Sequence, residues 1–289
     1  MRATGCFAIA TAVLAALMVS PAGADERPPI RVLLIAGGCC HNYARQTADL
    51  KAGIESRINA EVTVVLDDET TTRTRFDLYT NDRWAEGYDV VLHDECSADV
   101  TDKAYVQRIL AEHRRGVPCV NLHCAMHSYR WGDYRRPVED GADNAAWYEM
   151  LGIQSSGHGP KAAVSVSFTG EVPAVSGGLD NWTTSTDELY NNLRVFDGVT
   201  PVAMGEQLQP PSRAALKQNP DAPPQLETAI VAWTHTYGPK NARVFCLTLG
   251  HTDAVVESQE YLDLVARGVA WAAGQEAYAE EDAAPADRE

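Results

Sequence analysis

The stretch Arg31-Val-Leu-Leu-Ile-Ala-Gly-Gly38 decides the fold class of this chain. An unbroken apolar run ends in two glycines, which is the pattern of a central parallel strand and the turn that follows it. Residues 43–59 then place Leu50, Ile54 and Ile58 at four-residue spacing, which predicts a helix. A strand followed by a helix in this way is the first part of a βαβ unit.

The same alternation continues through the first half of the chain. We expect strands at 62–66, 88–93 and 117–123, and a helix that begins at Thr101 or Asp102 and runs to about residue 115. Because the apolar runs around Ile35, Leu92 and Val120 are each bounded by turn signals, we predict that they form adjacent parallel strands of one buried sheet. The fold class is therefore α/β with a mostly parallel central sheet.

The second half is less regular. Strands are expected at 162–168, 228–233 and 243–249, and a final helix at 257–273. The stretch 204–225 is rich in Pro, Gln and Ala, which predicts a long surface insertion. No repeat or linker divides the chain, so residues 25–274 are expected to form one domain.

The two ends of the chain read differently from this domain. Arg2, the apolar run 6–19 and the small residues Ala22-Gly-Ala24 are typical of a signal peptide over residues 1–24, with cleavage after Ala24. The apolar run is too short for a comfortable membrane span. We therefore expect a periplasmic or secreted protein with no membrane insertion after signal cleavage. Residues 275–289 are acidic and predict a disordered tail.

The net charge limits the classes of molecule that this protein is expected to bind. A formal net charge of −16 argues against nucleic acid and anionic membranes, because both require clustered Lys and Arg. A small molecule is the expected partner, and a homo-oligomer stays open.

Six cysteines follow the predicted cleavage site. Cys119 and Cys246 fall inside expected strands, where a buried cysteine behaves as a small apolar residue. The other four lie near expected strand ends, where one disulfide could form; they are Cys39, Cys40, Cys96 and Cys124. There is no CxxC pair and no zinc-ribbon spacing.

Four of the eight histidines sit where an expected strand gives way to a turn, namely His41, His123, His158 and His251. In an open α/β sheet, ligands bind at the carboxyl ends of the strands. Imidazole titrates near neutrality and also binds metals. We therefore predict that these histidines converge on one cleft, against the alternative that each is an isolated loop residue.

The segment 117–127 resembles a nucleophile elbow, in which an abrupt strand-to-helix turn exposes one side chain. His123 holds the elbow position, and Cys124 follows one residue later. Because a shift of one residue re-aims the side chain, we expect Cys124 to point toward the interior with its thiol protonated. His123 and His127 imitate a helical HxxxH metal motif, but the turn between them should separate the rings, so we expect a structural role for His127.

Several motifs together resemble the ThuA-like (trehalose utilisation) family. They are the Gly-Gly start with His41, Asn121-Leu-His-Cys-Ala125, Gly157-His158, Thr186-Asp-Glu-Leu-Tyr-Asn191, Ala232-Trp233, Leu249-Gly-His251 and Gly268-Val-Ala-Trp-Ala-Ala-Gly274. The resemblance implies a three-layer flavodoxin-like, class I glutamine amidotransferase-like fold without the amidotransferase cysteine. It also implies a role in the metabolism of trehalose, other disaccharides or their 3-keto derivatives. Cys39-Cys40 before His41 and Gly159 after His158 depart from the commoner family pattern.

The 187–190 string adds a carboxylate and aromatic groups. Glu188 is expected to partner the histidines, with Asp187 on the opposite face of the extended chain. Trp182 and Trp131 are candidates to stack on a sugar ring, and Tyr190 is a further candidate to bind the substrate.

The leading functional hypothesis is acid–base or metal-assisted chemistry on a carbohydrate, carried by His123, His251 and Glu188 with His41 and His158. The cofactor is not fixed by the sequence, and a divalent metal such as zinc is one candidate. Two alternatives stay open: a non-catalytic sugar-binding module, and a cysteine-dependent amidase or peptidase that uses Cys124.

Overall fold

The protein was analysed as a computed structural model that describes Met1 and residues 27–276. The predicted signal peptide and its cleavage site lie outside the described residues, as does the acidic tail from residue 277 onward. Among the described residues, no helix has the length and apolar character that crossing a bilayer requires.

The core of the fold is a nine-stranded sheet, of which five neighbouring strands are parallel. In spatial order these are β2 (Ala60–Leu66), β1 (Ile30–Gly38), β3 (Val90–Cys96), β4 (Cys119–Leu122) and β13 (Ala242–Leu247). Leu34 lies opposite Leu92, and Leu92 lies opposite Val120. The predicted α/β class and the predicted parallel strands around Ile35, Leu92 and Val120 are confirmed.

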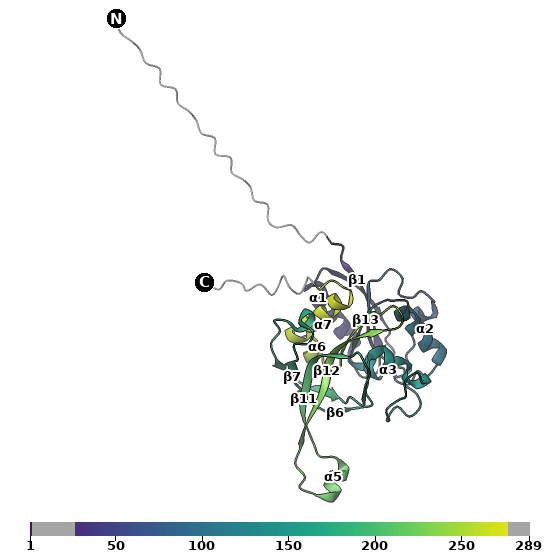
Figure 1. Cartoon of the computed structure of the whole chain (residues 1–289), viewed down its shortest axis with the longest axis vertical. Coiled ribbons are helices and arrows are strands. Elements are labelled where there is room, and N and C mark those ends of the chain that lie inside the picture. The colour runs from purple at the N-terminus through teal and green to yellow at the C-terminus, as the bar shows by residue number, and fades with distance from the viewer. Residues whose placement is uncertain (2–26, 277–289) are drawn as a thin grey trace.

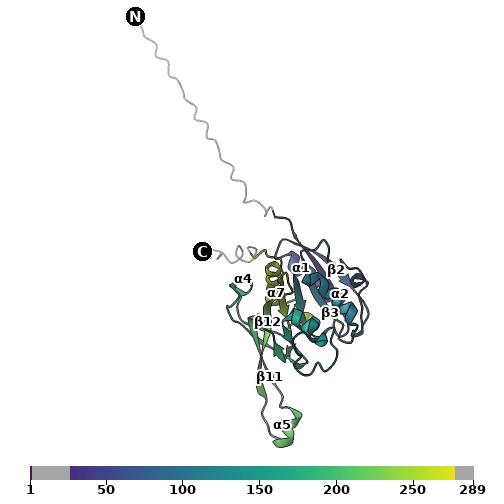
Figure 2. The ribbon, with the colours of Figure 1, turned by 45° about the vertical axis from the view of Figure 1, so that its right-hand side comes forward.

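The sheet continues beyond β13 in four antiparallel strands. They are β12 (Gln225–Tyr237), β11 (Thr200–Gln209), β7 (Ser165–Phe168) and β8 (Trp182–Thr183). β11 and β12 extend past the body of the protein as a hairpin arm that carries α5 (Arg213–Gln218) at its tip (Figures 1 and 2). The insertion predicted at 204–225 is therefore an ordered ribbon, and its polar composition reflects exposure of the arm to water.

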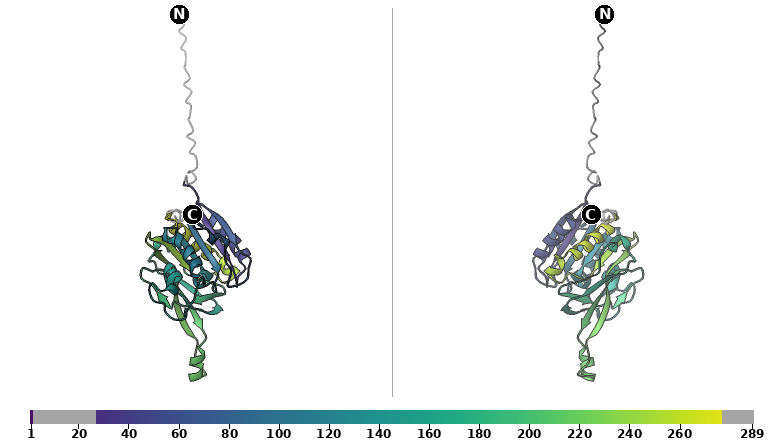
Figure 3. Two further views of the ribbon diagram at one scale, coloured as in Figure 1. Left: turned by 90° about the vertical axis from the view of Figure 1, so that its right-hand side faces the viewer. Right: turned by 90° about the vertical axis from the view of Figure 1, so that its left-hand side faces the viewer.

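Helices cover both faces of the parallel half, which gives three layers (Figures 1 and 3). α1 (Tyr43–Glu55), α7 (Gln259–Ala272), α4 (Pro173–Ser176) and α6 (Asp253–Val256) pack together on one face, and α2 (Lys103–Arg114) and α3 (Ala146–Leu151) pack on the other. Asp102 caps α2 as expected, since its side chain accepts from the Tyr105 backbone N–H.

The final helix shows how the sequence pattern produces this packing. α7 buries Leu262, Val265 and Val269 against the sheet, and each buried side chain of this size contributes about 1.5–3 kcal/mol. A Cβ at Gly268 would lie 2.2 Å from the Phe245 ring, so only glycine permits the observed approach of helix and sheet. Gly268→Ala would force the two apart.

Two short antiparallel pairs complete the fold. β6 (His158–Ala162) pairs with β9 (Asp187–Tyr190), and β5 (Ile153–Gln154) pairs with β10 (Arg194–Val195). The strand expected at 162–168 is thus divided between β6 and β7. Three 3₁₀ turns are η1 (Asp77–Thr80), η2 (His123–His127) and η3 (Asp143–Ala145). The β6–β9 pair matters most, because it brings a second set of polar side chains to the carboxyl edge of the parallel strands.

Candidate functional site

Side chains from four separate segments meet at the carboxyl edge of the parallel sheet. His41 follows β1, His123 follows β4, His251 follows β13, and Glu188 comes from β9. The ring centroids of His41 and His123 are 4.9 Å apart, those of His41 and His251 are 5.0 Å apart, and those of His123 and His251 are 5.5 Å apart. We call these four residues the edge cluster.

His123 occupies the turn with an uncommon backbone conformation. Its φ is +35°, in the left-handed region that few residues other than glycine adopt. Its Nδ1–H donates to the Thr248 carbonyl at 2.7 Å, which fixes the tautomer and makes Nε2 an acceptor. Nε2 faces the Tyr190 hydroxyl at 3.4 Å and Glu188 Oε2 at 3.7 Å. The elbow therefore aims the unprotonated nitrogen of His123 into the cluster.

Three atoms of the cluster have the arrangement of a metal site. His123 Nε2, Glu188 Oε2 and His251 Nδ1 all lie within 4.8 Å of one another, and His251 Nδ1 is 3.4 Å from Glu188 Oε2. His251 Nδ1 is buried and has no hydrogen-bond partner. Ligands at about 2.1 Å from a tetrahedral ion lie roughly 3.4 Å from each other. Two imidazoles and one carboxylate at these separations fit a divalent cation such as zinc.

The protonation of the histidines favours the same interpretation. Burial, and next the charge of His41, hold the pKa of His123 well below its ordinary value. Burial lowers the pKa of His251 to about 4, and burial also lowers the pKa of His41. Neutral imidazole is the form that binds metals and accepts protons. Burial raises the pKa of Glu188, which neighbouring His158 partly offsets.

Asp187 holds the two halves of the cluster together. Its carboxylate accepts from the backbone N–H of Gly250 at 3.0 Å, of His251 at 3.2 Å and of Glu188 at 2.7 Å. Burial raises the pKa of Asp187 to about 6, and the three backbone hydrogen bonds oppose this shift. The side chain thus joins the loop of His251 to the strand of Glu188, a role that the alternation of the extended chain did not predict.

Tyr190 forms the wall behind His123. Its ring stacks on His127 at 4.2 Å with an interplanar angle of 4°, and on its other neighbour, His158, at 5.7 Å with an angle of 25°. His127 Nε2 lies 2.8 Å from the Ser155 hydroxyl. His158 is more exposed, and its Nδ1 lies 3.5 Å from Glu188 Oε1 and donates to the Gly159 carbonyl at 2.8 Å. His158 is therefore at the mouth of the cluster and His127 is behind it.

A cleft of about 450 Å³ opens beside His158 and Tyr190. Its other polar lining residues come from β9, the loop after it and the base of the hairpin arm, and they include Asn191, Asn192, Gln209 and Glu227. A cavity of this size, with several hydrogen-bonding groups, accommodates a small polar ligand.

The two tryptophans expected at the site pack in different parts of the fold. Trp182 is in β8, the outermost strand of the antiparallel side, where it packs on Phe168 at 5.6 Å and lines a separate hollow of about 290 Å³. Three strands separate β8 from β13, so Trp182 lies on a different part of the sheet from the histidines, and its role as a ligand contact stays a prediction. Trp131 packs against the hydrophobic core on the side of α2 and α3, so its role as a ligand contact stays a prediction.

Cys124 is buried, as expected, yet it contacts the edge cluster. Its Sγ lies 3.0 Å from His41 Nε2, a pairing that the sequence did not indicate. His41 Nδ1–H donates to the His251 carbonyl at 3.0 Å, so His41 Nε2 is an acceptor. A hydrogen bond with Cys96, together with burial, raises the pKa of Cys124 well above its usual range, and the thiol stays protonated.

The parallel sheet with helices on both faces and a polar cluster at its carboxyl edge defines an α/β protein with a site at the classical ligand-binding position of such sheets. The chain belongs to the ThuA family, described as trehalose utilisation, whose model matches residues 31–272. The family membership predicted from the sequence motifs is thus confirmed.

Two solved ThuA-like structures agree with the fold. A ThuA-like protein from Parabacteroides merdae is 18% identical, with a TM-score of 0.59, over 85% of this chain and 90% of that chain. A ThuA-like protein from Bacteroides uniformis is 15% identical, with a TM-score of 0.55, over 86% and 93%. A glutamine amidotransferase from Thermotoga maritima is 11% identical, with a TM-score of 0.42, over 90% and 100%. No curated protein matches the chain significantly.

Proposed function

We propose that this protein is an exported carbohydrate-active enzyme in which His123, Glu188 and His251 bind a divalent metal ion such as zinc. The observation that carries the proposal is the convergence of these three ligand atoms within 4.8 Å, with His251 Nδ1 left without a hydrogen bond. A buried polar atom without a partner is costly, and a bound cation would satisfy it.

The surrounding residues support chemistry at such an ion. Neutral His123 and His251 are ready to ligate, and the Thr248 carbonyl orients His123 in the manner of an outer-shell partner. A bound divalent ion would polarise a sugar carbonyl or activate a water molecule. The more exposed His158, whose Nδ1 lies 3.5 Å from Glu188 Oε1, then offers an imidazole for proton transfer at the mouth of the cluster.

A disaccharide or its 3-keto derivative is the substrate class that we propose. The cleft beside His158 and Tyr190 has the volume for a small ligand, and its amide and carboxylate side chains suit the many hydroxyl groups of a sugar. The description of the family as trehalose utilisation favours the same class. We further propose export to the periplasm or beyond, on the pattern of residues 1–24.

The pairing of Cys124 with His41 favours a second candidate, a thiol-dependent amidase or peptidase. The 3.0 Å separation of Cys124 Sγ from His41 Nε2 is that of a nucleophile and its base. Two observations weigh against it: the sulfur is buried, and the raised pKa of Cys124 disfavours the thiolate.

Incubation with disaccharides and their 3-keto forms, with and without a chelator, tests the proposal by mass spectrometry of the products. We expect turnover that the chelator abolishes and zinc restores, and about one equivalent of metal by elemental analysis. His123→Ala should lose both turnover and bound metal. The matched control is His235→Ala, which should keep both, because His235 lies in β12 and its Nε2 contacts the Glu149 carbonyl.

Each other outcome has a distinct meaning. Binding of the sugar without turnover, with or without zinc, would identify a sugar-binding module and overturn the enzymatic proposal. Turnover that resists chelation but is blocked by iodoacetamide would identify the cysteine-dependent alternative.

A further inference from the structure

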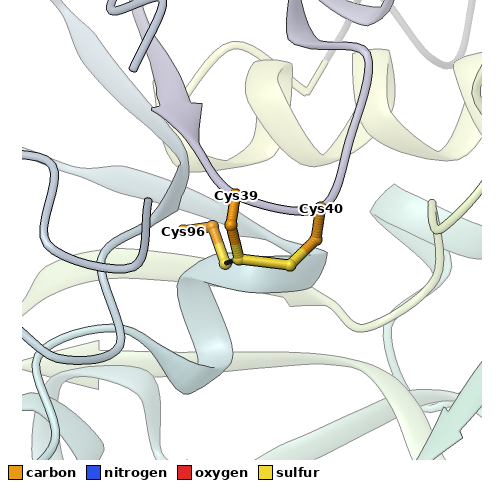
Figure 4. Close-up of side chains that lie close together, drawn as sticks. All are labelled: Cys39, Cys40 and Cys96. Carbon is orange, nitrogen blue, oxygen red and sulfur yellow. Dashed lines mark hydrogen bonds between the residues drawn. A yellow bond between two sulfur atoms is a disulfide. The ribbon is translucent and has the colours of Figure 1, made fainter. Parts of the chain in front are cut away.

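Three cysteine sulfurs lie together where β1 and β3 end. Cys39 and Cys40 are joined by a disulfide, and the Cys96 sulfur lies 3.4 Å from the Cys39 sulfur. In Figure 4 the Cys39 sulfur lies between those of Cys96 and Cys40. Thiol–disulfide exchange proceeds when a thiolate attacks one sulfur of a disulfide and the other sulfur leaves. The order of the three sulfurs is the order that such an attack by Cys96 on Cys39 requires.

The backbone holds Cys96 at this position. Gly38, the last residue of β1, is the register partner of Cys96 in β3. A Cβ at Gly38 would lie 2.4 Å from the Cys96 carbonyl oxygen, and the φ of Gly38 is +97°, so glycine is required for this close approach. The proximity of Cys96 to the disulfide therefore follows from strand pairing rather than from a flexible loop.

Exposure to solvent decreases from Cys40 through Cys39 to Cys96. Cys40 is exposed, Cys39 is half-buried, and Cys96 is buried. A hollow of about 410 Å³ opens beside Cys39, lined by residues 70–73 and Asp99. Small molecules can therefore reach the Cys39–Cys40 disulfide, whereas Cys96 is enclosed by the protein.

The surroundings of Cys96 favour its thiolate. A hydrogen bond from the Cys124 thiol lowers the pKa of Cys96, against the effect of burial, and the Cys39 backbone N–H adds a smaller contribution in the same direction. The thiolate is the form that attacks disulfides.

We propose that Cys39, Cys40 and Cys96 form a thiol–disulfide exchange site, in which the disulfide moves between Cys39–Cys40 and Cys39–Cys96. The Cys96 thiolate attacks Cys39 Sγ, the Cys39–Cys96 bond forms, and the Cys39–Cys40 bond breaks. Cys40 leaves as a thiolate and takes up a proton from solvent. The protein is neither oxidised nor reduced, so no external oxidant is required.

The exchange has two consequences for the molecule. It places a free thiol at the exposed position of Cys40, where small thiols and disulfides can react with it. It also withdraws the Cys96 thiolate from Cys124, which then has His41 Nε2 as its remaining neighbouring acceptor. The exchange site is thereby linked to the edge cluster, although the proposal does not depend on the proposed function.

Trapping with N-ethylmaleimide followed by non-reducing tryptic mapping tests the exchange. Trypsin places Cys39 and Cys40 in the peptide 32–45 and Cys96 in the peptide 84–103. We expect time-dependent conversion of the internally bonded peptide 32–45 into a 32–45/84–103 cross-linked pair that carries maleimide on Cys40. Cys96→Ala should lose the cross-link entirely, and Cys246→Ala, a buried cysteine of β13, should leave it unchanged.

A second variant keeps the test decisive if trapping is slow. Cys40→Ser with oxidised glutathione should form the Cys39–Cys96 disulfide and lose two free thiols per chain relative to the reduced protein. The proposal is overturned if Cys96 becomes alkylated while peptide 32–45 keeps its internal disulfide. It is equally overturned if Cys40→Ser yields only glutathione adducts of Cys39.

Discussion

Two histidine–glutamate groups in this protein differ in a way that separates a site from a scaffold. The edge cluster joins His41, His123, His251 and Glu188 at the carboxyl edge of the parallel sheet. A second group, which we call the inner network, lies between the sheet and α2 and consists of His93, His113, Glu95, Tyr79 and Tyr129.

Short hydrogen bonds connect the members of the inner network, and Glu95 Oε2 is its one side-chain oxygen that has no hydrogen-bond partner. Glu95 Oε1 accepts from Tyr79 and Tyr129 at 3.0 Å each and lies 2.9 Å from His93 Nδ1. His113 Nδ1–H donates to the Val117 carbonyl at 2.8 Å, so His113 Nε2 accepts from His93 Nε2–H at 3.0 Å. Every ring nitrogen in the inner network has a partner within hydrogen-bonding distance.

The edge cluster is open by comparison. Its histidine–carboxylate separations are 3.4–3.7 Å, and His251 Nδ1 has no hydrogen-bond partner. Histidine and glutamate together are thus insufficient evidence for a site. The informative features are separations that leave room for a third group and a position at the carboxyl edge of the sheet.

Glu95→Ala should give the largest effect and would confirm the inner network as scaffold. Removal of one member of a buried hydrogen-bonded network leaves its partners unsatisfied, and we expect a loss of about 3 kcal/mol in the free energy of unfolding. Urea denaturation measures this loss, with Glu86→Ala on the exposed surface as the control. If Glu95→Ala left the stability unchanged, or if it abolished zinc binding, the distinction between the two groups would be lost.

His123→Ala should show the reverse pattern. The folded protein should keep most of its stability but lose turnover of the sugar substrate by on the order of 10²-fold or more, because the side chain acts in the transition state or holds a metal. Steady-state kinetics and metal content measure the two losses. A variant that binds zinc and turns over substrate normally would show that the edge cluster is another scaffold.

The pH dependence of stability should involve both groups, and zinc should separate them. The pKa of His251 is lowered to about 4 and that of His113 to about 3, from an ordinary value of 6.5. The unfolded chain therefore binds more protons than the folded one below pH 6.5, and stability falls as the pH drops from 6.5 toward 4. Urea midpoints across this range measure the fall.

Above pH 6.5, zinc should raise the urea midpoint of the wild-type protein. This increase should disappear at lower pH, where protons displace the metal. His251→Ala should abolish the increase, and His113→Ala should retain it. An increase of equal size in both variants would place the metal elsewhere.

The sequence predicts the edge cluster because the position of each histidine follows from the strand directly before it. Each of His41, His123 and His251 follows an apolar run, and parallel strands bring their carboxyl ends to one edge. Glu188 was found through the family motif. This reasoning reaches only residues whose position is set by the end of a strand.

The inner network and the role of Asp187 escape such reasoning. His93 lies within β3 and His113 within α2, so their contact depends on how the helix packs on the sheet. Asp187 occupies the opposite face of its strand from Glu188, but the backbone of the Gly250 turn lies against that face and supplies its hydrogen bonds. Trp182 illustrates the converse, since an aromatic residue close to Glu188 in sequence lies on an outer strand in space.

Cys124 contacts the edge cluster without belonging to either group, and its substitution should give the smallest effect. Its sulfur contacts His41 of the edge cluster on one side and Cys96 on the other. Because burial and the hydrogen bond with Cys96 keep the thiol protonated, Cys124→Ala should change turnover by less than about threefold, far below the ~10²-fold expected for a group that acts in the transition state. Parallel kinetics of Cys124→Ala and His123→Ala on one substrate measure the difference. Loss of activity in Cys124→Ala, with His123→Ala nearly unaffected, would assign the reaction to the thiol and make the imidazole–carboxylate group its support.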